Sequence, residues 1–236
     1  MKRFWQSAEA AAVPGGGWQV LLDGKPMRVP GGGALLLPTE RLAHAVAAEW
    51  QQAGGGQDGE MSFAELPLTR IAGTGQHRIA PDPEPVILEL ARYGESDLLC
   101  YRAAGPSALA RRQQERWQPW LDWVERRHGA RLLVTEGVTH VAQPTPALAA
   151  LAAAVAGHDP YALAALGVAV PALGSLVLAL ALAEGALEAS EAHALSVLDE
   201  SYQEEQWGTD DESAARRANV AADIAAAGRL LALLRP

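Results

Sequence analysis

His193, Glu200 and Glu204 are the residues of this chain whose types and spacing come nearest to a catalytic or metal site. They stand at i, i+7 and i+11, so on a helix they would share one face. Carboxylate metal sites in helical bundles also use a Glu-x-x-His pair from each of two helices, and none occurs near the neighbouring glutamates. We therefore predict a solvated acidic face, with no metal site and no catalytic site. The alternative is a metal- or small-molecule-dependent helical-bundle enzyme that uses His193 and Glu200.

Other reactive side chains lack the surroundings that their chemistry requires. Ser175 in "LGSLV" has no second glycine of a nucleophile elbow. Cys100 in "DLLCYR" lies among apolar residues, which is typical of a thiol in the core. The glycine-containing stretches "GTGQHR" and "GGWQVLLDGKP" do not have the spacing of nucleotide-binding loops. We therefore expect no cofactor.

An acidic stretch late in the chain, "LDESYQEEQWGTDDE" at 198–212, contains seven acidic residues and no basic residue. Trp207 lies in its midst. An exposed Trp forgoes about 2 kcal/mol of burial, and exposed Trp side chains are typical of anchors at protein interfaces. The spacing is equally compatible with a second arrangement, in which Gly208 turns the chain and Trp207 packs beneath the last helix.

A helical projection of residues 191–206 separates a core face from an acidic face. The core face holds Leu195, Leu198 and Tyr202. The opposite face holds His193, Glu200, Gln203, Glu204 and, if the helix continues by one residue, Trp207. The acidic face suits a partner that presents Arg beside an apolar hollow. We predict that the residues contacting it are Glu200, Gln203, Glu204, Trp207 and Asp211.

Composition excludes several classes of protein. The chain has 236 residues, of which 49% are hydrophobic and 20% charged, as in ordinary globular proteins. A net charge of -9 argues against a nucleic-acid-binding surface, which needs clustered cations. The uncharged run 161–183 approaches the length of a membrane helix, about 20 residues, but glycines and Pro171 interrupt it. We predict two buried helices there, with no insertion into a membrane.

Charge is distributed unevenly along the chain. No Lys or Arg occurs between Arg131 and Arg216, whereas twelve acidic residues lie there. A basic cluster precedes this gap, formed by Arg111, Arg112, Arg116, Arg126, Arg127 and Arg131. We interpret most of the acidic residues as a solvated surface.

The first third of the chain has the pattern of a small α+β domain. Asp23-Gly24 separates two short apolar runs, which is typical of a β-hairpin. Thr39 is a suitable N-cap for a helix that the glycines at 54–56 would end. Three prolines within 80–85 then oppose regular structure. We predict an N-terminal α+β domain over residues 1–83.

Residues 84–236 are predicted to form an all-helical domain. The expected helices are 84–93, 107–117, one from near Pro119 to Gly129, ones beginning at 145 and 160, one from Pro171 to Gly185, and one after Ser190. Thr209 and the acids after it fit a capping box that opens the last helix. The predicted fold class is therefore α+β, with a larger helical bundle after the N-terminal domain.

Several stretches, taken in order, resemble the Atp-twelve family, the assembly chaperones that attend the alpha subunit of the F-type ATP synthase. They are "KRFW" from Lys2, "LDGKPMRVP", "LLLPTERLAHAVAAEW", "PLTRIAGT", "SDLLCYRA", "WQPWLDW", "GSLVLALALAEG" and "LDESYQEEQWG". They extend from residue 2 to beyond 208, and their order and spacing make the resemblance specific.

The resemblance implies a chaperone without enzymatic activity, which binds the unassembled alpha subunit, shields its assembly interface and uses neither ATP nor metal. It also implies a small α+β domain followed by an orthogonal helical bundle. The functionally important acid of the family's late motif falls on Glu200 here; Glu204 and Glu205 do not fit that motif. Because the chain begins almost directly with "KRFW", without the transit peptide of mitochondrial members, we expect a bacterial cytoplasmic protein.

Overall fold

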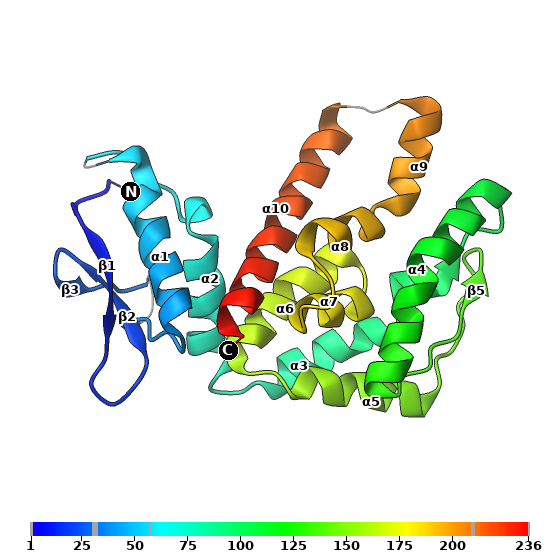
Figure 1. Ribbon diagram of the computed structural model, residues 1–236, viewed down its shortest axis with the longest axis horizontal. Helices are drawn as coiled ribbons and strands as arrows, with labels where there is room; N and C mark the ends of the chain where they lie inside the picture. Colours follow the sequence, from blue (N-terminus) through cyan, green and yellow to red (C-terminus); the bar gives the residue numbers. More distant parts are fainter. Residues whose placement is uncertain (1, 30–32, 57, 209–210, 236) are drawn as a thin grey trace. The chain divides into compact units, whose positions relative to one another are not determined.

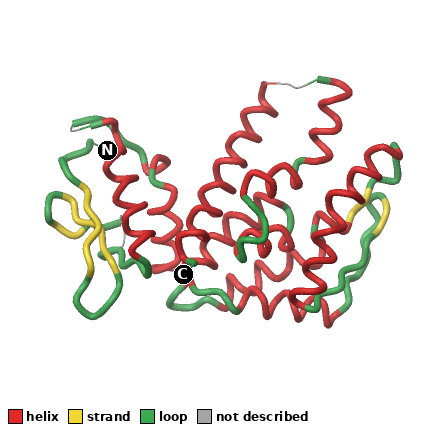
Figure 2. Tube along the Cα trace, in the orientation of Figure 1, coloured by secondary structure: helices red, strands yellow, loops and turns green. Residues whose placement is uncertain are grey.

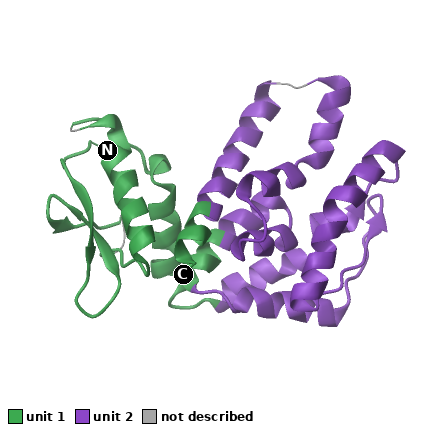
Figure 3. Cartoon of the chain, in the orientation of Figure 1, with its two compact units in different colours: residues 1–83, 160–165, 229–236 green, residues 84–159, 166–228 purple. Residues whose placement is uncertain are grey.

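The computed structural model describes residues 2–29, 33–56, 58–208 and 211–235. The chain forms two compact units (Figure 3). Unit 1 comprises residues 1–83 together with 160–165 and 229–236, and unit 2 comprises 84–159 and 166–228. The two short segments of unit 1, 160–165 and 229–236, belong to the part of the chain that the sequence predicts to be the helical domain. The proposed boundary between residues 83 and 84 coincides with a break between units.

Unit 1 is built on a three-stranded antiparallel sheet in the order β1-β2-β3 (Figure 1). Its strands are β1 (Ala8–Ala12), β2 (Trp18–Leu22) and β3 (Lys25–Pro26). Asp23 and Gly24 connect β2 to β3 with φ values of 47° and 78°. Positive φ at both central residues is what a two-residue hairpin turn of this type requires. The predicted hairpin is therefore confirmed.

Unit 1 also contains α1 (Glu40–Gln52), which packs on β1 and β2, and α2 (Pro67–Thr74), together with the helical residues of 160–165 and 229–234. Thr39 caps α1 as predicted, accepting a hydrogen bond from the Leu42 N–H at 3.2 Å. The buried Glu49 carboxylate of α1 accepts hydrogen bonds from the N–H groups of Leu68 (2.7 Å) and Thr69 (3.0 Å), at the start of α2. An acid at a helix N-terminus is favourable because the N–H groups there lack partners within the helix.

Unit 2 is mostly helical (Figure 2). Its helices are α3 (Glu84–Ala91), α4 (Ser107–His128), α5 (Thr145–Ala156), most of α6 (Pro160–Leu173), α7 (Leu176–Ala183), α8 (Ala189–Ser196), α9 (Leu198–Trp207) and α10 (Asp211–Leu234) up to residue 228. A short parallel pair, β4 (Tyr101–Arg102) with β5 (Thr135–Glu136), was not predicted. Together the two units give the predicted α+β class, with a small sheet domain and a helical bundle.

The predicted buried helices are α6 and α7. Every residue of α7 is buried, which explains the long uncharged stretch. No helix in the described part of the chain is long and apolar enough to cross a membrane. At the start of α7 the fully buried Asp97 carboxylate accepts hydrogen bonds from the Ser175 hydroxyl (2.8 Å) and from the N–H groups of Leu99 (3.1 Å) and Val177 (3.0 Å). Burial raises the pKa of Asp97.

The predicted helix starts at residues 145 and 160 are confirmed by α5 and α6, whereas Pro119 and Pro171 do not mark helix boundaries. The sequence favours separate helices on either side of Pro119, but α4 is continuous from Ser107 to His128. Pro119 lies exposed, so the carbonyl group that it leaves without an N–H donor can be hydrated. Pro171 likewise lies inside α6, which ends two residues later at Leu173. The predicted capping box at Thr209 lies outside the described residues.

Candidate functional site

The acidic region is carried by two helices, α8 and α9, and not by one helix over 191–206. The break is at Val197, where φ is -104° and ψ is 22°. As a result His193 does not lie exposed with the acidic face: it is half-buried, and its Nε2 atom is buried without a hydrogen-bond partner among the described residues. Burial lowers the pKa of His193, and the nearby Arg217 lowers it further, while Glu200 acts in the opposite direction.

Helix α4 holds the start of α9 through a buried amide. The Gln113 side chain is fully buried; its Nε2 donates to Asp199 Oδ1 at 2.8 Å, and its Oε1 accepts from the Ala103 N–H at 2.7 Å. The indole N–H of the buried Trp117 donates to the Leu195 carbonyl at 2.9 Å. Hydrogen bonds from buried groups are costly to break, because each buried donor or acceptor left without a partner lowers the stability of the fold by about 1–3 kcal/mol. These bonds therefore hold the end of α8, through Leu195, and the start of α9, through Asp199.

A second contact with α4 lies further along α9. Arg112 donates from both Nη atoms to the two Glu205 oxygens, at 2.7 and 2.8 Å, and its guanidinium lies over the Tyr202 ring with 5.1 Å to the ring centroid. Hydrogen bonding from Arg112 lowers the pKa of Glu205. Glu205 is therefore occupied by a partner from its own chain.

Glu204 is also paired within the chain. Its carboxylate forms an ion pair with Arg217 of α10, and about a fifth of each side chain is exposed. This pair connects α9 to α10 across the connection at 209–210. Glu204 was among the residues predicted to contact a partner, and the structure shows that its carboxylate is already engaged.

The remaining predicted contact residues point into solvent. Glu200, Gln203 and Asp211 are exposed, and Trp207 is 80% exposed, so Trp207 does not pack beneath the last helix. Glu200, Gln203 and Trp207 stand at i, i+3 and i+7 on α9 and therefore share one face. Neither Glu200 nor Asp211 forms an ion pair with any residue that the structure describes. We call Glu200, Gln203 and Trp207 the α9 face.

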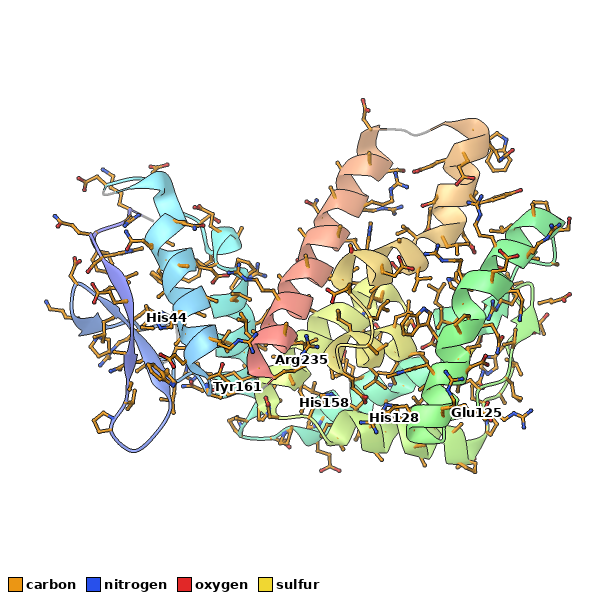
Figure 4. All side chains as sticks on the ribbon, in the orientation of Figure 1. His44, Glu125, His128, His158, Tyr161 and Arg235 are labelled. Atoms are coloured by element: carbon orange, nitrogen blue, oxygen red, sulfur yellow. The ribbon has the colours of Figure 1, made fainter. Side chains whose placement is uncertain are left out.

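The basic cluster before the charge gap is the counterpart of the acidic region. Besides Arg112 with Glu205, Arg116 pairs with Glu191 of α8. At the end of α4, Arg127 and His128 both contact Glu184, at 2.6 and 2.9 Å (His128 is labelled in Figure 4). The acidic residues are thus not only a solvated surface, because several of them fasten α7, α8 and α9 to α4.

The residues that hold the α9 face in place were not predicted from the sequence. Arg112 belongs to the basic cluster, whose charge complements that of 184–212, and this complementarity was the available signal. Gln113 gave no signal, because a glutamine in a polar helical stretch has no distinctive pattern. Arg217 is recognisable only once α10 is known to lie beside α9, as it does in Figure 1.

The reactive side chains are buried, unlike the residues of the α9 face. Cys100 is buried, and burial, with Asp97 nearby, raises the pKa of its thiol to about 12. Ser175 is buried and caps α7. In the described ranges, no three His, Cys, Asp or Glu side chains come together as metal ligands. The residues of the alternative, His193 and Glu200, belong to different helices, α8 and α9.

Comparison with known proteins adds a family to this geometry. A family model described as "ATP12 chaperone protein" matches residues 2–125, which is more than half of the chain. Among characterised proteins, the mitochondrial protein atp12 of Schizosaccharomyces pombe is 25% identical over 221 residues, covering 88% of this chain and 74% of the yeast protein.

Solved structures show the same fold. The crystal structure of Atp12 from Paracoccus denitrificans is 43% identical with a TM-score of 0.92, covering 99% of this chain and 98% of that one. A mutant of the Paracoccus protein, in which a lysine replaces an aspartate, has the same TM-score of 0.92. Atu1473 from Agrobacterium tumefaciens, described as a candidate chaperone, is 42% identical with a TM-score of 0.92, covering 99% of this chain and 86% of that one.

Proposed function

Because this chain belongs to the ATP12 chaperone family, we propose that it assists assembly of the F-type ATP synthase by binding the unassembled alpha subunit. The family membership supports the chaperone class. The binding of the alpha subunit is what the sequence motifs imply, and the α9 face is the surface that we assign to it. In this proposal the chaperone covers the surface that the alpha subunit later presents to the beta subunit, and so prevents aggregation.

The observation that carries the assignment is the contrast between paired and unpaired residues on α9. Asp199, Glu204 and Glu205 are each bound by a side chain of the chaperone itself. Glu200 and Trp207, in contrast, are exposed on one face of the same helix. A Trp that remains exposed on a helix fixed at both ends is suited to bind another protein, because little conformational entropy is lost when it does so.

The chemistry of the face indicates the surface of the client that it would bind. A carboxylate two helical turns from an indole, about 10 Å along the axis, matches a basic side chain beside an apolar depression. Charge complementarity of this kind speeds capture and selects the partner more than it raises affinity. Such binding is suitable for a chaperone that must release the alpha subunit when the beta subunit arrives.

The paired acids have a different role in this proposal. Glu204 and Glu205 hold α9 between α10 and α4, and they do not contact the client. We propose that Glu200, Gln203 and Trp207 make the contact, and that Asp211, exposed at the start of α10, adds to the negative charge beside it.

A charge reversal tests the proposal. We expect Glu200→Lys to bind purified alpha subunit about tenfold more weakly than the unchanged chain, because attraction to a basic group becomes repulsion. Glu89→Lys is the matched control, since Glu89 is an exposed acid on α3 in the same unit. Binding would be measured by recovery of the alpha subunit on immobilised chaperone, with folding checked by circular dichroism. Equal recovery by the two variants would contradict the assignment of Glu200.

We further propose that the protein acts in the bacterial cytoplasm, where the alpha subunit is synthesised. The fungal relative is named as mitochondrial. Fractionation of the source cells followed by immunoblotting would test the location, and recovery in the membrane fraction after a salt wash would contradict it.

A further inference from the structure

Unit 1 contains an apolar hollow beside the hairpin. Its volume is about 390 Å³, within the range of about 300–1,000 Å³ that is usual for ligand pockets. The apolar side chains that line it include Phe4, Leu22, Met27, Val29, Trp50 and Phe63. Phe4 is 71% exposed, so an aromatic ring stands at the opening. An apolar surface of this kind is a candidate for contact with another apolar group.

The charged residues of the hollow are both basic. Lys25 and Arg28 belong to its lining, both are exposed, and neither forms an ion pair with a residue that the structure describes. Asp23, the acidic residue nearest to Lys25 in the sequence, accepts hydrogen bonds from the N–H groups of Gln6 (3.0 Å) and Ser7 (2.9 Å). The hollow is therefore locally basic in a chain whose net charge is -9.

This combination selects one kind of occupant. Apolar walls favour a large apolar side chain, at about 25 cal/mol for each Å² removed from water. Lys and Arg side chains that form no ion pair with a described residue favour a carboxylate at the same place. We propose that the hollow binds a peptide segment of another protein in which a Leu or Phe side chain stands next to Asp or Glu. This site lies in unit 1 and uses none of the residues of the α9 face, so it goes beyond the function proposed above.

The edge of the hairpin explains why side chains would dominate recognition. Pro26 in β3 has no N–H group and cannot donate to an added strand. The N–H of Met27 already donates to the Val20 carbonyl at 2.8 Å. A peptide therefore gains little from pairing with this strand, and its apolar and acidic side chains must supply the specificity.

Binding of short labelled peptides to the full chain tests the proposal. The probes are fluorescein-labelled Gly-Asp-Leu-Phe-Glu-Gly and its charge-inverted counterpart Gly-Lys-Leu-Phe-Lys-Gly, followed by fluorescence anisotropy. We expect saturable binding of the acidic peptide and at least tenfold weaker binding of the basic one. No saturable binding of the acidic peptide, or equal binding of the two, would overturn the proposal.

Variants then locate the site. We expect Phe4→Ser to weaken binding of the acidic peptide at least fivefold, and the double variant Lys25→Glu with Arg28→Glu to weaken it at least tenfold. The matched control is Arg70→Glu with Arg78→Glu, which reverses two exposed cations of unit 1 outside the hollow; it should bind the peptide like the unchanged chain. Unchanged binding by both hollow variants would place the peptide elsewhere and overturn the inference.

A further variant separates this inference from the proposed function. Glu200→Lys should leave peptide binding unchanged, since Glu200 is not in the lining. Loss of alpha-subunit binding in that variant with intact peptide binding would support both proposals. If Glu200→Lys still bound the alpha subunit, only the assignment of the α9 face would be contradicted. If Glu200→Lys lost peptide binding, the site in the hollow would be overturned.

Discussion

Replacing Trp207 by alanine should impair client binding while leaving the fold nearly unchanged. The side chain is 80% exposed, so about a fifth of its surface is removed from water. Truncating a fully buried Trp costs about 3–5 kcal/mol. One fifth of that range is about 1 kcal/mol or less, which is the loss that we expect in the free energy of unfolding.

The effect on binding should be larger. If Trp207 is an anchor for the client, its truncation costs about 2 kcal/mol or more. A loss of 2 kcal/mol corresponds to about a 30-fold increase in Kd. Titration of the purified alpha subunit against each chaperone would measure the Kd, and urea unfolding followed by circular dichroism would measure stability.

Leu88→Ala is the control for this experiment. Leu88 is a large apolar side chain of unit 2 with 57% exposure, and it lies on α3, outside the α9 face. The Leu88→Ala variant should bind the client as tightly as the unchanged chain does. If Trp207→Ala raised Kd less than threefold while remaining folded, the assignment of Trp207 as an anchor would be refuted. If Trp207→Ala lost several kcal/mol of stability, the inference that this exposed side chain contributes little to the fold would be refuted.

Two further predictions concern ionisable groups of unit 2, the buried Asp97 and the half-buried His193. Asp97→Ala should lower the free energy of unfolding in urea by about 3 kcal/mol, because the donors of Leu99, Ser175 and Val177 lose their acceptor. For His193, burial holds the folded-state pKa below the ordinary value of 6.5. The unfolded chain therefore takes up a proton first as pH falls, so His193 lowers stability below about pH 6.5. His193→Gln removes this loss. The difference in free energy of unfolding between the variant and the unchanged chain should therefore shift in favour of the variant as the pH is lowered from 7.5 to 5.5.

Each of these predictions has an outcome that contradicts it. If Asp97→Ala changed the free energy of unfolding by less than 1 kcal/mol, water or a rearranged loop would be accepting the hydrogen bonds of the donors at the start of α7. A stability difference between His193→Gln and the unchanged chain that does not vary with pH would mean that His193 titrates alike in the folded and unfolded states.

Local signals in the sequence predicted those elements whose cause is local. Asp23-Gly24 adopts the turn that its own backbone preferences favour, and Thr39 caps the helix that follows it. Pro119 shows where this reasoning fails. Its cost to a helix is local, but contacts along 22 residues of α4 maintain the helix through it. The break at Val197 is not marked by Gly or Pro, and the sequence does not indicate it.

For the candidate site, the sequence predicted a carboxylate-rich face with its leucines inward, but could not distinguish one acid from another. Leu195 and Leu198 are buried, and Glu200 is exposed, as the helical projection indicates. Glu204 and Glu205 have the same charge as Glu200 and lie within one or two turns of it. Their difference arises from residues on other helices.

The sequence by itself determined the class of fold, the apolar core helices and the accumulation of acidic residues beside an aromatic one, because periodicity and composition act between neighbours along the chain. Only the tertiary structure decided which acids are available to a partner. Arg112, 93 residues away in sequence, binds Glu205, and Arg217 of α10 binds Glu204. Ion pairs depend on distance in space, and the distance between charges on different helices is set by the packing of those helices.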